Sequence, residues 1–116
     1  MSILIVDDDL EFGRAAAELL ADRGYRVLGQ ATSAAEALAK CDQLDPDAVL
    51  LDVRLPDGNG VELATKLHAR PRPPRILLTS TDRDAVSAQP VRESGARGFI
   101  PKTELAECNL DEFLRS

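Results

Sequence analysis

The sequence has no long hydrophobic run. Its longest apolar stretches, such as Ile3-Leu4-Ile5-Val6, hold four residues, whereas a helix that crosses a membrane needs about 20. The chain also lacks the basic start of a secretory signal, because Met1 and Ser2 lead directly into that apolar stretch. These two absences predict a cytoplasmic protein without a membrane segment.

Basic residues are too few for a nucleic-acid binder. The chain has 14 Lys and Arg residues against 20 Asp and Glu residues, which gives a formal net charge of −6 at pH 7. Proteins that bind nucleic acid need cations to neutralise the phosphates. We therefore expect no direct contact with nucleic acid.

Histidine and cysteine are scarce as well. His68 is the single histidine, which excludes a metal site built from several imidazoles; we expect it to be structural or solvent-exposed. Cys41 and Cys108 have neither CxxC nor other metal-ligand spacing. We interpret them as reduced thiols of a cytosolic protein.

What remains is the composition of one ordinary globular domain. The chain has 116 residues, of which 44% are hydrophobic and 29% are charged. This length and balance allow a buried core without disulfides. We expect residues 1–116 to form one domain, with no internal repeat.

Apolar runs alternate with segments of helical periodicity along the chain. Continuous apolar runs predict strands buried on both faces, over residues 2–6, 25–31, 48–53, 75–79 and 97–100. Apolar residues at helical spacing predict helices over residues 9–23, from 33 to 46, 61–69, 84–94 and from about 110. This alternation predicts an α/β fold: a doubly wound, five-stranded parallel sheet in the order 2-1-3-4-5, with helices on both faces.

Two of these helices carry start signals, and one contains a proline. Ser33 with Glu36 and Asn109 with Glu112 have the spacing of capping boxes. Pro90 lies inside the fourth helix. Because proline lacks the N–H and clashes with the preceding turn, we expect that helix to be short, kinked, or restarted with Pro90 in its first turn.

Polar residues stand where the predicted strands end: Asp7, Asp8 and Asp9 after the first strand, Asp52 at the end of the third, Thr79 at the end of the fourth and Lys102 after the fifth. The carboxyl ends of parallel strands meet at one edge of a doubly wound sheet, where ligands bind. Since the strand limits rest on the apolar pattern alone, this coincidence favours one shared site.

Each of these residues also has a simpler explanation. Asp9 is expected only to cap the following helix. Asp7 and Asp8 could do the same, but beside Asp52 they would repel one another, and Mg²⁺ is the natural counter-ion for a set of hard oxygen ligands. Thr79 alone is uninformative, and Lys102 alone is usually a solvated cation.

Four segments, in order and covering nearly the whole chain, resemble the signatures of the response regulator receiver domain of two-component signalling. They are Ile3-Leu4-Ile5-Val6-Asp7-Asp8, Asp52-Val53-Arg54-Leu55-Pro56-Asp57-Gly58-Asn59-Gly60, Leu77-Leu78-Thr79-Ser80 and Gly95-Ala96-Arg97-Gly98-Phe99-Ile100-Pro101-Lys102. The resemblance implies a flavodoxin-like, CheY-like fold. It also implies a signalling phosphoprotein rather than a turnover enzyme, one that assists its own aspartate phosphorylation and dephosphorylation.

The resemblance assigns a role to each matching residue. Asp52 would accept a phosphoryl group from a sensor histidine kinase or a phosphotransfer protein. Mg²⁺ would be held by Asp7, Asp8, Asp52 and the backbone carbonyl of Arg54. Thr79 and Lys102 would contact phosphoryl oxygens, and Thr79 with Phe99 would form the switch. The face made by the fourth helix, fifth strand and fifth helix would carry the signal and could form a homodimer.

Some positions depart from the family pattern or stay open. Thr103 follows Lys102 where many receivers have proline, so the isomer of that peptide bond is left open. Arg54 and Thr81 would tune the lifetime of the phosphoryl group, in a direction that the sequence does not give. The basic loop from Arg70 to Arg75 is interpreted as a solvated connection, with a partner contact as the lesser alternative.

Two other functions compete with that of a receiver. An aspartyl-phosphate phosphatase usually has a second acid two residues after the nucleophile, where this chain has Arg54, and usually a cap domain. A pseudo-receiver would bind without transferring phosphate, which the set of polar residues at the strand ends argues against. The sequence contains no signal that identifies the cognate kinase, the stimulus, the output or the oligomeric state. It also leaves open whether the chain is a stand-alone receiver or part of a longer regulator.

Overall fold

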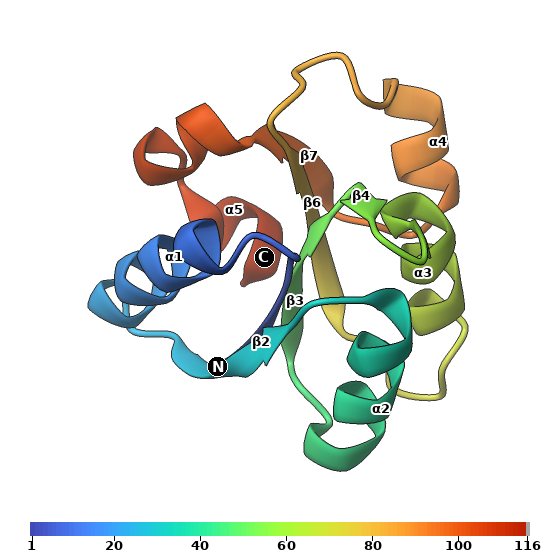
Figure 1. Cartoon of the computed structure of the whole chain (residues 1–116), viewed down its shortest axis with the longest axis horizontal. Helices are drawn as coiled ribbons and strands as arrows, with labels where there is room; N and C mark the ends of the chain where they lie inside the picture. The colour runs from blue at the N-terminus through green and yellow to red at the C-terminus, as the bar shows by residue number, and fades with distance from the viewer. Residues whose placement is uncertain (116) are drawn as a thin grey trace.

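The computed structural model describes residues 1–115. Five parallel strands form the central sheet in the order β2-β1-β3-β6-β7 (Figure 1). They are β1 (Ser2–Val6), β2 (Arg26–Ala31), β3 (Ala48–Asp52), β6 (Arg75–Ser80) and β7 (Gly98–Pro101). The predicted order 2-1-3-4-5 is confirmed. The numbering differs because a two-stranded ribbon of β4 (Arg54–Leu55) and β5 (Gly58–Asn59), which the sequence pattern did not reveal, follows β3.

Helices cover both faces of the sheet, as predicted (Figure 1). They are α1 (Leu10–Asp22), α2 (Ala34–Leu44), α3 (Gly60–His68), α4 (Ala88–Glu93), α5 (Leu110–Leu114) and the 3₁₀ helix η1 (Lys102–Glu107). Two apolar cores result. The core under α1 and α5 contains Ile3, Ile5 and Leu50, and the core under α2, α3 and α4 contains Leu4, Val49 and Leu51.

The unbroken apolar run of β1 is explained by these two cores. Successive side chains of a strand point to opposite faces, so Ile3 and Leu4 enter different cores, and both are 0% exposed. A strand with one solvated face would alternate apolar and polar residues instead. The same burial on both faces places β1, β3 and β6 in the middle of the molecule.

Helix α4 is short, and the start predicted near Asp84 is wrong. The helix begins at Ala88, and Pro90 is its third residue. The N–H groups of the first turn have no partner inside a helix, so proline is tolerated there and not farther along. The prediction that Pro90 would lie in the first turn is therefore confirmed, and the segment 81–87 forms turns and bends.

Of the two predicted capping boxes, the one at Ser33 forms in part: the Ser33 side chain caps the helix, but Glu36 reaches the N–H of the residue before the N-cap rather than that of Ser33. Ser33 Oγ accepts the N–H of Glu36 at 3.1 Å, and Glu36 Oε1 accepts the N–H of Thr32 at 2.8 Å. The box predicted at Asn109 is wrong, because the Asn109 side chain makes no capping hydrogen bond. Helix α5 is held from outside instead: Tyr25 donates its hydroxyl hydrogen to Asp111.

The histidine, the basic loop and the cysteines interpreted above are not part of the strand-end cluster. His68 is exposed at the C-terminal end of α3. In the basic loop, Arg70 pairs with Asp42 and Arg72 pairs with Asp45. Both cysteines are free thiols, and burial raises the pKa of each.

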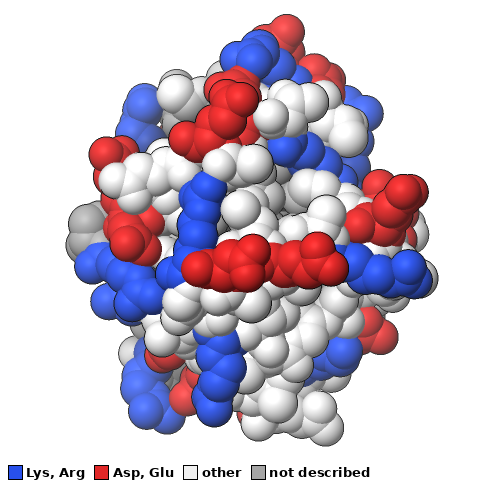
Figure 2. Space-filling view, turned by 90° about the vertical axis from the view of Figure 1, so that its left-hand side faces the viewer, with Lys and Arg blue, Asp and Glu red and all other residues white. Residues whose placement is uncertain are grey.

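The surface carries mixed charge on the side of α1. Figure 2 faces this side and shows acidic side chains in a row, with basic side chains around them and pale uncharged surface between. Within residues 1–115, no helix combines the length and apolar character needed to span a bilayer. Among the same residues every peptide bond is trans, so the Lys102–Thr103 bond left open above is trans as well.

Candidate functional site

The strand register places the polar residues predicted for the site at one edge of the sheet. Asp52, the last residue of β3, is the Cα partner of Thr79 on β6. Val6 pairs with Leu51, so Asp7 comes directly after the end of β1 beside β3. Pro101 ends β7, and Lys102 follows it. The apolar pattern of four strands therefore delivers these side chains to the same place.

Three carboxylates gather there. Asp7, Asp8 and Asp52 each offer one oxygen, and these oxygens lie within 4.8 Å of one another. Asp7 is 1% exposed and Asp52 7% exposed, whereas Asp8 is exposed to solvent. Burial raises the pKa of Asp7 and the charge of Asp52 raises it further, against hydrogen bonds from Lys102 and the Asp9 N–H that lower it.

Tight turns hold two of the carboxylates in place. Asp7 Oδ1 accepts the N–H of Asp9 at 2.9 Å, and Asp52 Oδ1 accepts the N–H of Arg54 at 3.1 Å. Aspartate favours this bond to the backbone two residues later. Because each carboxylate uses one oxygen on its own turn, its other oxygen is directed at the shared site.

Lys102 supplies the positive charge of the cluster. Its Nζ lies 2.7 Å from Asp7 Oδ2 and 3.3 Å from Asp52 Oδ2, and its side chain is 10% exposed. Burial alone would lower the pKa of Lys102, but the pairing with Asp7 and Asp52 outweighs burial and raises it. Lys102 is therefore an ammonium at neutral pH, and it bridges two carboxylates.

The donor set fits a divalent cation. One ammonium faces three carboxylates, so the cluster keeps an excess of negative charge. Apart from the Lys102 ammonium at 2.7 Å, the buried Asp7 Oδ2 has no hydrogen-bond donor among the described residues. Hard oxygen ligands without histidine or thiol suit Mg²⁺.

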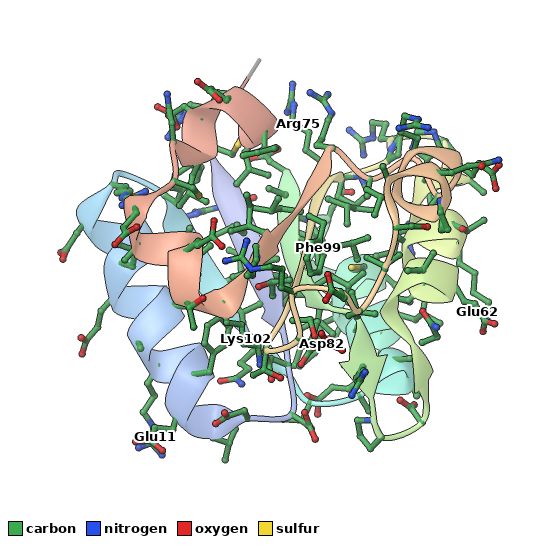
Figure 3. The ribbon with its side chains drawn as sticks, turned by 90° about the horizontal axis from the view of Figure 1, so that it is seen from above. Glu11, Glu62, Arg75, Asp82, Phe99 and Lys102 are labelled. Carbon is green, nitrogen blue, oxygen red and sulfur yellow. The ribbon has the colours of Figure 1, made fainter. Side chains whose placement is uncertain are left out.

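Thr79 and Phe99 are the two residues predicted to form the switch. Thr79 is 1% exposed, and its Oγ1 donates to the Ile100 carbonyl of β7 at 2.7 Å rather than to Asp52. Phe99 is half-buried and lines a pocket of about 370 Å³ between α4 and β7. Figure 3 shows Phe99 on β7 and Lys102 beyond the end of that strand.

Ion pairs tie the loop after β6 to both sides of the site. Arg54 Nη2 lies 3.3 Å from Asp82 Oδ2, and Arg83 pairs with Glu104 of η1. The Arg54 side chain is 73% exposed, and Thr81 is exposed as well. These two ion pairs connect the segment between β6 and α4, on which Figure 3 labels Asp82, to Arg54 and to η1.

The family model of the response regulator receiver domain matches residues 3–113. The chain belongs to this family. It is 39% identical over 104 residues to the DNA-binding transcriptional activator DevR/DosR of Mycobacterium tuberculosis, covering 88% of this chain and 48% of that protein. The chain spans about half or less of the length of the curated relatives it matches.

Solved receiver structures share the fold. A CheY-like receiver domain protein from Methanospirillum hungatei superposes with a TM-score of 0.76 at 29% identity, covering 91% of this chain and 87% of that one. A response regulator from Burkholderia pseudomallei, solved with a phosphorylated aspartic acid and a calcium ion, gives a TM-score of 0.82 at 25% identity, covering 97% of this chain and 65% of that one. The recognition as a CheY-like receiver of two-component signalling is therefore confirmed.

Sequence reasoning missed several residues that shape this receiver site. Gln30 Nε2 donates to the Asp7 carbonyl at 2.9 Å and to the Asp9 carbonyl at 3.2 Å, which fixes the acidic turn from β2. Gly60 leaves room for the Asp52 backbone, since a Cβ at Gly60 would lie 2.1 Å from the Asp52 carbonyl oxygen. The Gln30 contacts have no local signature, because they join residues 23 and 21 positions apart; Gly60 stands inside the segment that resembles the phosphoacceptor signature, but its packing against Asp52 was not foreseen.

Phe12 was also missed as a residue of the site. Helical spacing placed it on the core face of its helix, and it does pack against that core. Its ring also lies over Lys102, with Nζ 4.3 Å from the ring centroid. The signal that could have indicated this role is the position of Phe12 in the first turn of the helix that directly follows the aspartates.

Proposed function

We propose that the chain is the phosphoacceptor receiver of a two-component system and that Asp52 takes a phosphoryl group from a histidine kinase or a phosphotransfer protein. The observation that carries this proposal is the position of Asp52: buried at a strand end, paired with Lys102 and grouped with Asp7 and Asp8. Charge neutralisation and alignment, which this cluster offers, are what phosphoryl transfer needs most.

In this proposal each polar group has one task. Asp52 attacks the phosphorus of the donor phosphohistidine, forming an O–P bond as the N–P bond breaks. Mg²⁺ would be held by Asp7, Asp8, Asp52 and the Arg54 backbone carbonyl, and it would supply positive charge to the transferring group. Lys102 leaves Asp7 to pair with a phosphoryl oxygen.

The switch follows from the new charge at Asp52. Phosphorylation adds about −1.5 to −2 charge and strong acceptor oxygens, so Thr79 Oγ1 exchanges the Ile100 carbonyl for a phosphoryl oxygen. Phe99 then turns within the pocket between α4 and β7. The face formed by α4, β7 and α5 changes shape and acts on the output, by homodimerisation or on another partner.

We assign the whole chain, residues 1–116, to this receiver and place it in the cytoplasm. The net charge of −6 opposes direct contact of this domain with nucleic acid, so DNA binding such as that of the mycobacterial relative would belong to another domain. The receiver assists its own phosphorylation and dephosphorylation and does not turn over an external substrate.

The test is chemical labelling. The purified chain is incubated with acetyl phosphate and Mg²⁺, and intact mass is recorded. We expect one phosphate per chain, and none in the Asp52→Asn variant, whose fold is checked by circular dichroism. Undiminished labelling of Asp52→Asn would mean that the acceptor is another residue, and hydrolysis of external phosphate esters would favour a phosphatase.

A further inference from the structure

The Lys102 ammonium has an aromatic neighbour as well as its two carboxylates. Nζ lies 4.3 Å from the centroid of the Phe12 ring, within the roughly 6 Å range of a cation–π contact. Phe12 belongs to the first turn of α1, and Lys102 is the first residue of η1. Figure 3 shows Lys102 between the ribbon of α1 and the edge of the sheet.

Open space lies beside the ring and the lysine side chain. Phe12 and Lys102 line an apolar groove of about 230 Å³ between α1 and η1, together with Ala15, Ala16, Leu19, Leu105 and Ala106. A lysine side chain is a flexible four-carbon stem that ends in a point charge. A smaller aliphatic side chain at position 12 would open this groove toward Nζ and would not attract the charge.

We infer that Phe12 is a positioning residue, whose ring holds the Lys102 ammonium over Asp52 so that it is in place when the phosphoryl group arrives. This inference rests on the proposed role of Asp52 as phosphoacceptor. Lys102 must change partner from Asp7 to a phosphoryl oxygen, and the ring offers it a contact throughout that exchange. A charge aligned beforehand lowers the barrier, because the ordering is complete before transfer.

The alternative role of Phe12 is core packing alone, since the ring also packs against the core beneath α1. Aromatic and aliphatic replacements separate the two. Phe12→Tyr keeps a ring, whereas Phe12→Leu and Phe12→Met keep apolar volume without one. Leu19→Ala is the matched control, because Leu19 lines the same groove but lies seven residues, about two helical turns, beyond Phe12 in α1.

The experiment measures the rate of Asp52 labelling by acetyl phosphate at saturating Mg²⁺ for each variant. A cation–π contact of ordinary strength predicts a loss of about threefold to tenfold in Phe12→Leu and Phe12→Met. We expect rates within about twofold of wild type in Phe12→Tyr and in Leu19→Ala. Two aliphatic variants are used so that a folding defect in one does not remove the test, and thermal unfolding checks each.

A double-mutant cycle shows whether the effect passes through Lys102. In a Lys102→Ala background, Phe12→Leu should cause no further loss of rate. An equal loss with and without Lys102, or a wild-type rate in both aliphatic variants, would overturn the inference and leave the proposed function standing. Failure of the wild-type chain to become labelled would overturn the proposed function, and the inference with it.

Nuclear magnetic resonance reports the contact itself. The ring current of Phe12 should shift the ε-methylene protons of Lys102 upfield in the wild type and in Phe12→Tyr. The shift should vanish in Phe12→Leu. Unchanged Lys102 resonances in Phe12→Leu would contradict the contact, whatever the labelling rates.

Discussion

Asp7 is a carboxyl group at a place where burial opposes its negative charge. Asp7 is 1% exposed, and its pKa is raised by burial and further by the neighbouring charge of Asp52. Lys102 offsets part of this through its 2.7 Å contact. A buried carboxylate that is incompletely compensated lowers the stability of the metal-free fold, as functional sites often do.

We predict that Asp7→Asn stabilises the metal-free protein at neutral pH. The variant removes a desolvated charge and leaves Lys102 paired with Asp52. We expect the free energy of unfolding to rise by on the order of 1 kcal/mol, an ordinary size for one substitution. Urea unfolding in the presence of a chelator measures it.

The pH dependence of this gain follows from the direction of the shift. Below the ordinary pKa of 3.8, Asp7 is protonated in both states and the two proteins differ little. As pH rises, the unfolded chain ionises first, so the wild type loses stability relative to the variant until the folded carboxyl ionises too. A variant that is less stable than wild type at pH 7 would show that the contact to Lys102 outweighs burial.

At the scale of elements, the ribbon of β4 and β5 supports a helix distant in sequence. Asp57, in the turn between these strands, accepts the N–H of Ala34 at 2.7 Å on Oδ1 and the N–H of Ala35 at 3.0 Å on Oδ2. These backbone hydrogen bonds lower the pKa of Asp57. The segment after the proposed phosphoacceptor is thereby fastened to the N-terminus of α2.

We predict that Asp57→Ala lowers the melting midpoint by a few degrees at pH 7, because two N–H groups of the first turn lose their acceptor. The folded pKa lies below the ordinary 3.8, so the stabilisation is present above that value and fades as pH falls through the folded pKa. Thermal melts at pH 7 and at about pH 3 measure the difference. Asp57→Asn keeps one acceptor and should lose less, and a difference that does not shrink at low pH would contradict the capping role.

The parts of the fold that follow from local pattern could be predicted from sequence. The strands are continuous apolar runs because both of their faces are buried, and their carboxyl ends bring the site residues to one edge. This pattern was enough to predict that Asp52 lies beside Thr79 and that Lys102 lies near the carboxylates of Asp7 and Asp52. The chemical roles of these residues stay predictions until labelling tests them.

The parts that depend on distant contacts could not be predicted. Helix η1 begins at Lys102, whose side chain pairs with Asp52 at the end of β3 and with Asp7 directly after β1. The cap of α2 involves Asp57, which is 23 and 22 residues away in sequence from the two N–H groups it accepts. Asn109 had the spacing of a cap, but α5 is held by Tyr25 instead. In each case a tertiary contact decides what local pattern leaves open.

At the scale of the whole molecule, the two apolar cores meet the carboxylate cluster at the edge where β1 and β3 end. The chain has a net charge of −6. On the side of α1, Figure 2 shows acidic and basic side chains interspersed. At the cluster, by contrast, three carboxylates face one ammonium. A cation that binds there and not to the unfolded chain stabilises the entire fold by mass action.

We therefore predict that Mg²⁺ raises the free energy of unfolding, by about 2.7 kcal/mol when its concentration is 100 times its dissociation constant. Two neighbouring residues offer a matched pair of variants. Asp8 is exposed, so Asp8→Ala should keep the metal-free stability within about 0.5 kcal/mol and lose the response to Mg²⁺. Asp9 caps α1 by accepting the N–H groups of Glu11 and Phe12, so Asp9→Ala should lose about 1 kcal/mol of metal-free stability and keep the response. Equal responses to Mg²⁺ in both variants would exclude Asp8 as a ligand and would reduce the metal site to Asp7 and Asp52.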